Sequence, residues 1–149
     1  MAKRILAVVA GLVVWTVVAT VAGLIMRGTW RDYAAVADAM TFTLPMMVAR
    51  LSIGAVATII AGWITAVIWK RSALLASVTG LVVLLLFIPQ HIMLWAKFPV
   101  WYHLTFLLTL VPLSVVGGQL GRMRQIRRTA VEFGETAERR KEKSAPARA

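Results

Sequence analysis

The sequence predicts an all-α integral membrane protein, folded as a bundle of four transmembrane helices. Four apolar segments, each about 20 residues or longer, run along the chain of 149 residues. At 1.5 Å of rise per residue, a helix of about 20 residues crosses the roughly 30 Å of hydrocarbon in a bilayer. Apolar residues make up 60% of the chain and its mean hydropathy is +0.78, whereas a soluble domain is about half apolar. Most of the chain is therefore expected to lie in lipid.

The expected spans are residues 5–26, 45–69, 73–95 and 101–121. The first span has features of a cleaved signal peptide, because Lys3 and Arg4 precede it. Its apolar run is longer than the roughly 7–15 residues of a signal sequence, so we expect it to stay as a membrane anchor. Together the spans form an expected transmembrane domain of residues 1–128.

Between the first two spans, residues 29–42 are expected to form a short amphipathic helix at the membrane surface. Thr29 and Asp32 have the spacing of a capping box, in which an acid follows a hydroxyl cap three residues later. Apolar and aromatic residues then recur on one face: Trp30, Tyr33, Ala37, Met40 and Leu44. A helix with such a face lies in the headgroup region, where Trp and Tyr are favoured.

Small residues mark the faces through which the spans are expected to pack. In lipid there is little hydrophobic drive between helices, so close approach at small residues decides which faces meet. The second span carries such a residue every four positions, at Gly54, Thr58, Gly62 and Ala66. We therefore place this span at the centre of the bundle. The other spans offer Ala19 and Gly23, Ala76 and Gly80, and Gly117 and Gly121.

Basic residues near the span ends fall on alternate sides of the membrane. One side collects Lys3, Arg4, Lys70, Arg71, Arg122, Arg124, Arg127 and Arg128. The other side collects only Arg27, Arg31, Arg50 and Lys97, partly offset by Asp32 and Asp38. The positive-inside rule then places both termini in the cytoplasm. The connection of residues 27–44 and the turn of residues 96–100 are expected to face outward.

The net charge of +11 is expected to serve contact with the membrane and not with nucleic acid. Most of it lies just beyond a span or in the tail, where anionic lipid headgroups are the nearest polyanion. We expect a lipid-facing basic cluster of Arg122, Arg124, Arg127 and Arg128 on a continuation of the fourth helix, although a topogenic stop signal explains the same residues. An apolar stripe accompanies the cluster: Leu120, Met123, Ile126, Ala130 and Phe133. Residues 129–149 form a charged cytoplasmic tail that we expect to be largely disordered.

Three spans place ionisable side chains at a similar depth, near the outward end. Arg50 lies early in the second span, His91 late in the third and His103 in the first turn of the fourth. The candidate ligand or proton site comprises Arg50, Gln90, His91, Tyr102 and His103. An arginine there suits a phosphate or carboxylate, and a histidine there suits proton relay. Two imidazoles from neighbouring helices are also able to ligate haem or a metal ion.

A purely structural interpretation of the same residues stays open. Arg50 extends its guanidinium to the headgroups, and Tyr102 and His103 belong to an aromatic belt at the interface. Pro89 removes a backbone hydrogen bond, and Gln90 or His91 satisfies the groups that it frees.

Several chemistries are absent from the sequence. It contains no cysteine, which excludes disulfides, iron–sulfur clusters and thiolate metal sites. It also lacks a HExxH motif, a Gly-rich phosphate loop and an ordered set of Ser, His and Asp. We therefore predict no catalytic residues, no metal site and no cofactor.

The most distinctive stretch is residues 88–103, with the sequence IPQHIMLWAKFPVWYH. With the Leu-rich helix that follows it, this stretch resembles the outer hairpin of uncharacterised small four-span bacterial inner-membrane proteins, over about 35 residues. The resemblance implies a bacterial inner membrane and brings no particular activity with it.

Three functions remain open from the sequence. The leading hypothesis is a non-enzymatic accessory or structural membrane component that packs through small-residue faces, with a membrane-protein partner or copies of itself. The second is an oligomeric small transporter or channel that uses Arg50, Gln90, His91 and His103. The third is a haem- or metal-binding redox protein. No acid lies within the four apolar segments, which counts against cation coupling.

Overall fold

The computed structural model describes residues 2–69 and 73–144, and these residues form five helices and no β-strand. The helices are α1 (Ala2–Thr29), α2 (Arg31–Val36), α3 (Leu44–Ile68), α4 (Ala73–Met93) and α5 (Val100–Ser144). Side chains are described as far as Thr136, apart from those of Ala73, Gln125 and Arg128.

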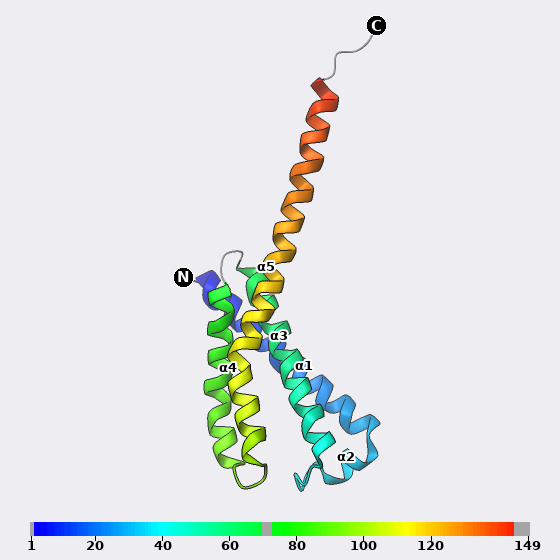
Figure 1. The fold of residues 1–149 in the computed structure, drawn as a ribbon, viewed down its shortest axis with the longest axis vertical. Coiled ribbons are helices and arrows are strands. Elements are labelled where there is room, and N and C mark those ends of the chain that lie inside the picture. The colour runs from blue at the N-terminus through cyan, green and yellow to red at the C-terminus, as the bar shows by residue number, and fades with distance from the viewer. Residues whose placement is uncertain (1, 70–72, 145–149) are drawn as a thin grey trace.

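The predicted fold class is confirmed. Helices α1, α3, α4 and α5 are each long and apolar enough to cross a membrane, so the chain is a small multi-pass membrane protein. Figure 1 shows two distinct ends of the bundle. The loop end holds α2 and the turn between α4 and α5. The terminal end holds the N-terminus and the point where α5 leaves the bundle.

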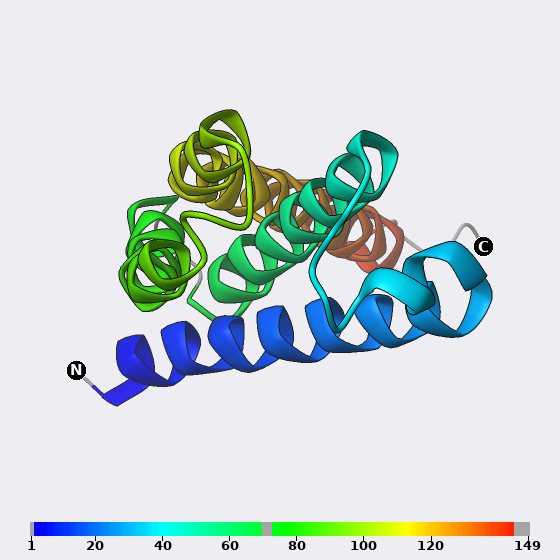
Figure 2. The same ribbon diagram turned by 90° about the horizontal axis from the view of Figure 1, so that it is seen from below.

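Helix α3 is central, because it contacts α1, α4 and α5. Figure 2 shows it lying between α1 and α5. Glycines allow the backbones of α3 and α5 to come close. A Cβ atom at Gly62 would overlap the carbonyl group of Ser114, and one at Gly117 would overlap the carbonyl group of Ile59. At Gly54 a Cβ atom would lie 2.8 Å from the Phe106 ring.

The predicted small-residue ridge of α3 is therefore used inside the chain. Thr58 and Ala66 are buried like the glycines of the ridge. Because α5 covers Gly54 and Gly62, this face is not available to a partner.

Helix α1 packs through Gly11 and not through Gly23. A Cβ atom at Gly11 would meet the Thr65 side chain and, at 3.1 Å, the Ala61 carbonyl oxygen. At Gly23 a Cβ atom would have no described atom within 4 Å. The expected contact at Gly23 is not made within the chain, because a small residue permits close approach without requiring a neighbour, and a contact there between copies stays a prediction.

Hydroxyl groups occupy the middle of the bundle. Those of Thr58, Thr65, Thr79 and Ser114 each lie within hydrogen-bond distance of a backbone carbonyl oxygen. Thr58 also accepts from Trp15 Nε1 at 3.0 Å, and the hydroxyl oxygens of Thr65 and Thr79 are 3.0 Å apart. These bonds satisfy polar groups that lipid cannot solvate.

The connection between α1 and α3 differs from the prediction. α2 has six residues and is followed by a turn over residues 37–40, whereas we expect a helix over residues 29–42. Thr29 ends α1, where its hydroxyl donates to the Ile25 carbonyl at 2.8 Å, and no side chain caps α2. The capping-box prediction is wrong because α1 extends beyond its expected end at residue 26 and includes Thr29.

Helix α5 continues through Ser144, so the backbone of residues 129–144 is helical where we expect disorder. Glu, Ala, Arg and Lys are strong helix formers, and a helix that continues from a span needs no new nucleus. The expectation of disorder at residues 145–149, and the expected basic turn at Lys70 and Arg71, lie outside the described residues.

Candidate functional site

Arg50 lies at the loop end, among aromatic side chains from three other segments. Its Nη1 donates to the Tyr33 hydroxyl at 2.6 Å, and its Nε donates to the Tyr102 hydroxyl at 3.4 Å. The guanidinium carbon lies 4.8 Å from the centre of the Phe42 ring, a cation–π arrangement. Arg50 thereby joins α3 to α2, to α5 and to the connection before α3.

No carboxylate among the described side chains forms an ion pair with Arg50. The ion pair that these side chains do form joins Arg27 to Asp38 at 2.7 Å, and both partners are exposed. A guanidinium carries five N–H groups, and the two tyrosines account for two of them. The charge of Arg50 is thus held by phenol oxygens and a ring face, both of which are neutral.

The two histidines form a direct hydrogen bond between α4 and α5. His91 Nδ1 and His103 Nδ1 are 2.7 Å apart, and both rings are buried. One nitrogen must carry the hydrogen and the other must be bare, so the pair is compatible with at most one imidazolium.

The second nitrogen of His103 has no hydrogen-bond partner in the part of the chain that the structure describes. His103 is fully buried, and its Nε2 is a buried polar atom without a partner among the described residues. Either tautomer leaves Nε2 unsatisfied, as a donor or as an acceptor. A buried unsatisfied group of this kind costs about 1–3 kcal/mol.

Aromatic rings connect the two halves of the cluster. The Trp95 ring stacks on His103 with centroids 4.8 Å apart, and the Phe98 ring stacks on Tyr102 at the same distance. Phe98 also stacks on Phe42 at 5.9 Å. We use the name aromatic–histidine cluster for this group: Tyr33, Phe42, Arg50, His91, Trp95, Phe98, Tyr102 and His103.

Four of the five predicted site residues belong to this cluster, and Gln90 lies apart from it. Gln90 is exposed, because one residue of helix rotates its side chain by about 100° from that of His91. Tyr33, Phe42, Trp95 and Phe98 were not predicted as members. The sequence predicts Tyr33 only as an interfacial aromatic. Its contact with Arg50 arises because α2 folds back over Arg50, and no regular spacing in the sequence indicates that fold.

The side chains of the cluster that could ligate a metal ion are the two histidines, whose imidazole rings form a hydrogen bond with each other. The described residues contain no group of three His, Cys, Asp or Glu side chains able to hold a metal ion. The residues present thus fit a hydrogen-bonded pair better than a metal or haem site.

The predicted basic cluster lies at the terminal end. Arg122, Arg124 and Arg127 are exposed on α5 just beyond the expected span, and the side chain of Arg128 lies outside those described. The Arg124 guanidinium carbon is 5.7 Å from the Trp63 ring centre.

Comparison of the chain with protein-family models, with curated proteins and with solved structures gives no match.

Proposed function

We propose that this chain is a non-enzymatic accessory protein of a bacterial inner membrane, with both termini in the cytoplasm and the loop end facing outward. We propose further that it joins a partner membrane protein through Arg50, whose guanidinium receives a carboxylate of that partner. The distribution of basic residues between the two ends supports the orientation.

One observation carries this proposal: Arg50 lies inside a spanning helix, and no carboxylate pairs with it among the described side chains. Ionisable residues in spans are costly, and they pair with one another or face a functional site. The phenol hydroxyls of Tyr33 and Tyr102 orient the guanidinium but leave its charge uncompensated. A carboxylate would complete the site with charge-assisted hydrogen bonds.

The partner in this proposal is a different protein and not a second copy. The four apolar segments of this chain contain no Asp or Glu, so a second copy brings no carboxylate from a span, and its loop-end acids Asp32 and Asp38 lie on the connection before α3. The ridge of Gly54 and Gly62 is occupied by α5, which leaves the loop end and the lipid-facing surfaces for association.

The test compares Arg50→Gln with Tyr33→Phe after gentle detergent extraction, with native electrophoresis as the readout. Arg50→Gln removes the charge, whereas Tyr33→Phe removes the hydroxyl contact and keeps the charge. We expect Arg50→Gln to abolish a native complex that Tyr33→Phe retains, and Arg50→Lys to retain part of it. Equal loss in both variants would reduce Arg50 to a structural role. A complex that Arg50→Gln leaves intact would refute the proposal.

The bond between His91 and His103 favours one second candidate, an oligomeric transporter or channel that handles protons. Chains of hydrogen-bonded histidines occur in proton relays. The buried hydroxyls of Thr58, Thr65 and Ser114 add hydrogen-bonding groups in the middle of the bundle. Proton flux into liposomes decides this, since equal leak in wild type and His91→Phe removes the candidate.

A further inference from the structure

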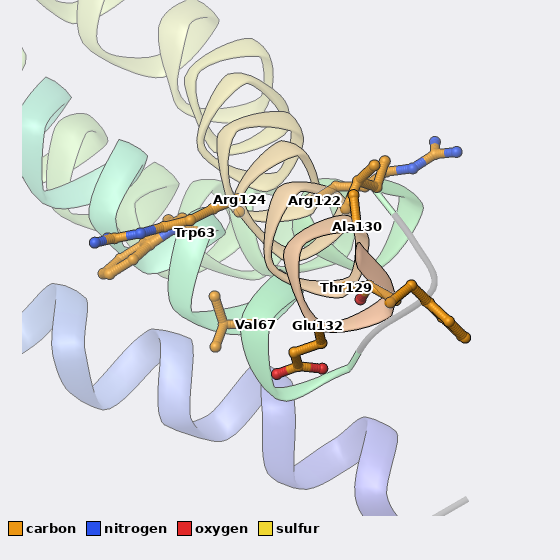
Figure 3. A pocket seen from close by; sticks show the side chains of 10 residues that line it. Trp63, Val67, Arg122, Arg124, Thr129, Ala130 and Glu132 are labelled. Carbon is orange, nitrogen blue, oxygen red and sulfur yellow. The ribbon is translucent and has the colours of Figure 1, made fainter. Parts of the chain in front are cut away.

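A cleft of about 930 Å³ lies at the terminal end, between the last turns of α3 and the part of α5 that leaves the bundle. Its lining includes Trp63 and Val67 from α3 and Arg122, Arg124, Ile126 and Phe133 from α5. Figure 3 shows Arg124 alongside Trp63, while Arg122 leaves α5 on another side. The two guanidinium groups thus lie on different sides of α5, and that of Arg124 lies beside Trp63.

The cleft begins at the depth where hydrocarbon ends. α5 starts at Val100, and about 20 residues of helix cross the roughly 30 Å of hydrocarbon, which brings the boundary to about Leu120. The headgroup layer adds roughly 5–8 Å on each side. Arg122 and Arg124 lie within about 6 Å of this boundary by helical rise, so both fall in the headgroup layer.

Charge in the cleft is separated along α5. Arg122 and Arg124 lie at the end near the membrane, and the acid of the cleft, Glu132, lies ten residues beyond Arg122. Ten residues of helix are about 15 Å, so a group that binds Arg124 at the membrane boundary lies apart from the acid. Neither arginine forms an ion pair among the described side chains.

Apolar surface lies beside these cations. Trp63 and Val67 line the cleft from the side of the bundle, and Val67 is 37% exposed. Ile126 adds an exposed apolar side chain at the outer edge of the headgroup layer. The cleft thus offers an apolar wall toward the hydrocarbon and guanidinium groups at phosphate depth.

We propose that this cleft is a binding site for one anionic phospholipid of the leaflet at the terminal end. The phosphate lies against the Arg124 guanidinium beside Val67, and an acyl chain runs along Trp63 toward the hydrocarbon. A planar guanidinium suits a phosphate. A second copy is a poorer occupant, because it would bring like charges together. The site is independent of Arg50 and of the partner proposed above.

The test measures retained lipid by native mass spectrometry. The full chain is loaded with phosphatidylglycerol or with phosphatidylcholine in mild detergent. We expect Arg124→Gln to lower the retained phosphatidylglycerol at least fivefold. Arg127→Gln is the matched control, because it removes the same charge from the same helix outside the cleft lining. We expect this control to change retention less than twofold.

A second variant tests the apolar wall without changing charge. Val67→Trp fills the cleft from α3, and we expect it also to lower retained phosphatidylglycerol at least threefold. Circular dichroism must show the helical content of wild type in each variant counted. Equal losses from Arg124→Gln and Arg127→Gln would overturn the site in favour of general surface attraction. Equal retention of the two lipids, or unchanged retention in Val67→Trp, would overturn it as well.

Discussion

His91 and His103 share a hydrogen bond in an apolar setting, where a lost partner cannot be replaced by bulk water. Removing one ring leaves the Nδ1 atom of the other without its bond. Removing both rings takes away both polar groups, and with them the unsatisfied Nε2 of His103. The loss in the free energy of unfolding therefore depends on whether one ring or both rings are replaced.

We expect His91→Leu and His103→Leu each to lower the free energy of unfolding by about 1–3 kcal/mol. The double variant should lose less than the sum, with a coupling of about 1 kcal/mol or more. Thermal unfolding in detergent, followed by circular dichroism, measures the three differences. Gln90→Leu is the control on the exposed side of α4 and should change little. Strictly additive losses would contradict the pairing.

At the scale of elements, Arg50 positions α2 on the bundle. α2 has only six residues and no side-chain cap, so its own hydrogen bonds are too few to keep it folded. The bond from Arg50 to Tyr33 and the stacking of Tyr33 on Phe42, with centroids 5.0 Å apart, attach it to α3. Apolar packing of Tyr33 and Ala37 also holds this region, whereas the ion pair between Arg27 and Asp38 is exposed and contributes little.

Tyr33→Phe should therefore speed amide hydrogen exchange in residues 31–37 by about tenfold or more, since a hydrogen bond to a charged group contributes about 1.5–3 kcal/mol. Asp38→Asn breaks the exposed ion pair, and we expect it to change exchange by less than about threefold. Exchange measured by mass spectrometry on protein in nanodiscs compares the two. A larger effect from Asp38→Asn than from Tyr33→Phe would contradict the claim that the bond from Arg50 to Tyr33 holds α2 on the bundle.

Close backbone contact between α3 and α5 makes a second prediction at this scale. Gly62→Ala places a methyl group on the Ser114 carbonyl, which only a separation of the two helices relieves. We expect a fall of about 1–3 kcal/mol in the free energy of unfolding, as overpacking usually causes. Gly23→Ala adds the same methyl group in open space and should leave stability equal or slightly higher. Equal stability of the two variants would count against the helix contact.

At the scale of the whole molecule, the spans were predictable because hydropathy over about 20 residues reflects the thickness of the bilayer. The shared depth of Arg50, His91 and His103 followed from their distances to the span ends. The hydrogen-bond partners of these residues could not be predicted from the sequence. Tyr33, for example, reaches Arg50 because α2 folds back across the loop end. Gly11 and Gly23 look alike in the sequence, and only the crossing of α1 over α3 separates them.

We propose that the chain crosses the membrane four times, with the loop end outside and the terminal end inside. The absence of cysteine allows single cysteines to report the side of each segment. Suitable exposed positions are Ala2, Ala39, Ala96 and Gly134, replaced one at a time by Cys. The reagent is a maleimide that cannot cross membranes, applied to intact cells whose outer barrier is permeable to it.

Labelling of Ala39→Cys and Ala96→Cys in intact cells, with Ala2→Cys and Gly134→Cys labelled only after the membrane is opened, is the expected result. Labelling of Ala2→Cys and Gly134→Cys from opposite sides would contradict the four crossings. Labelling of all four positions in intact cells would contradict the membrane-spanning bundle itself.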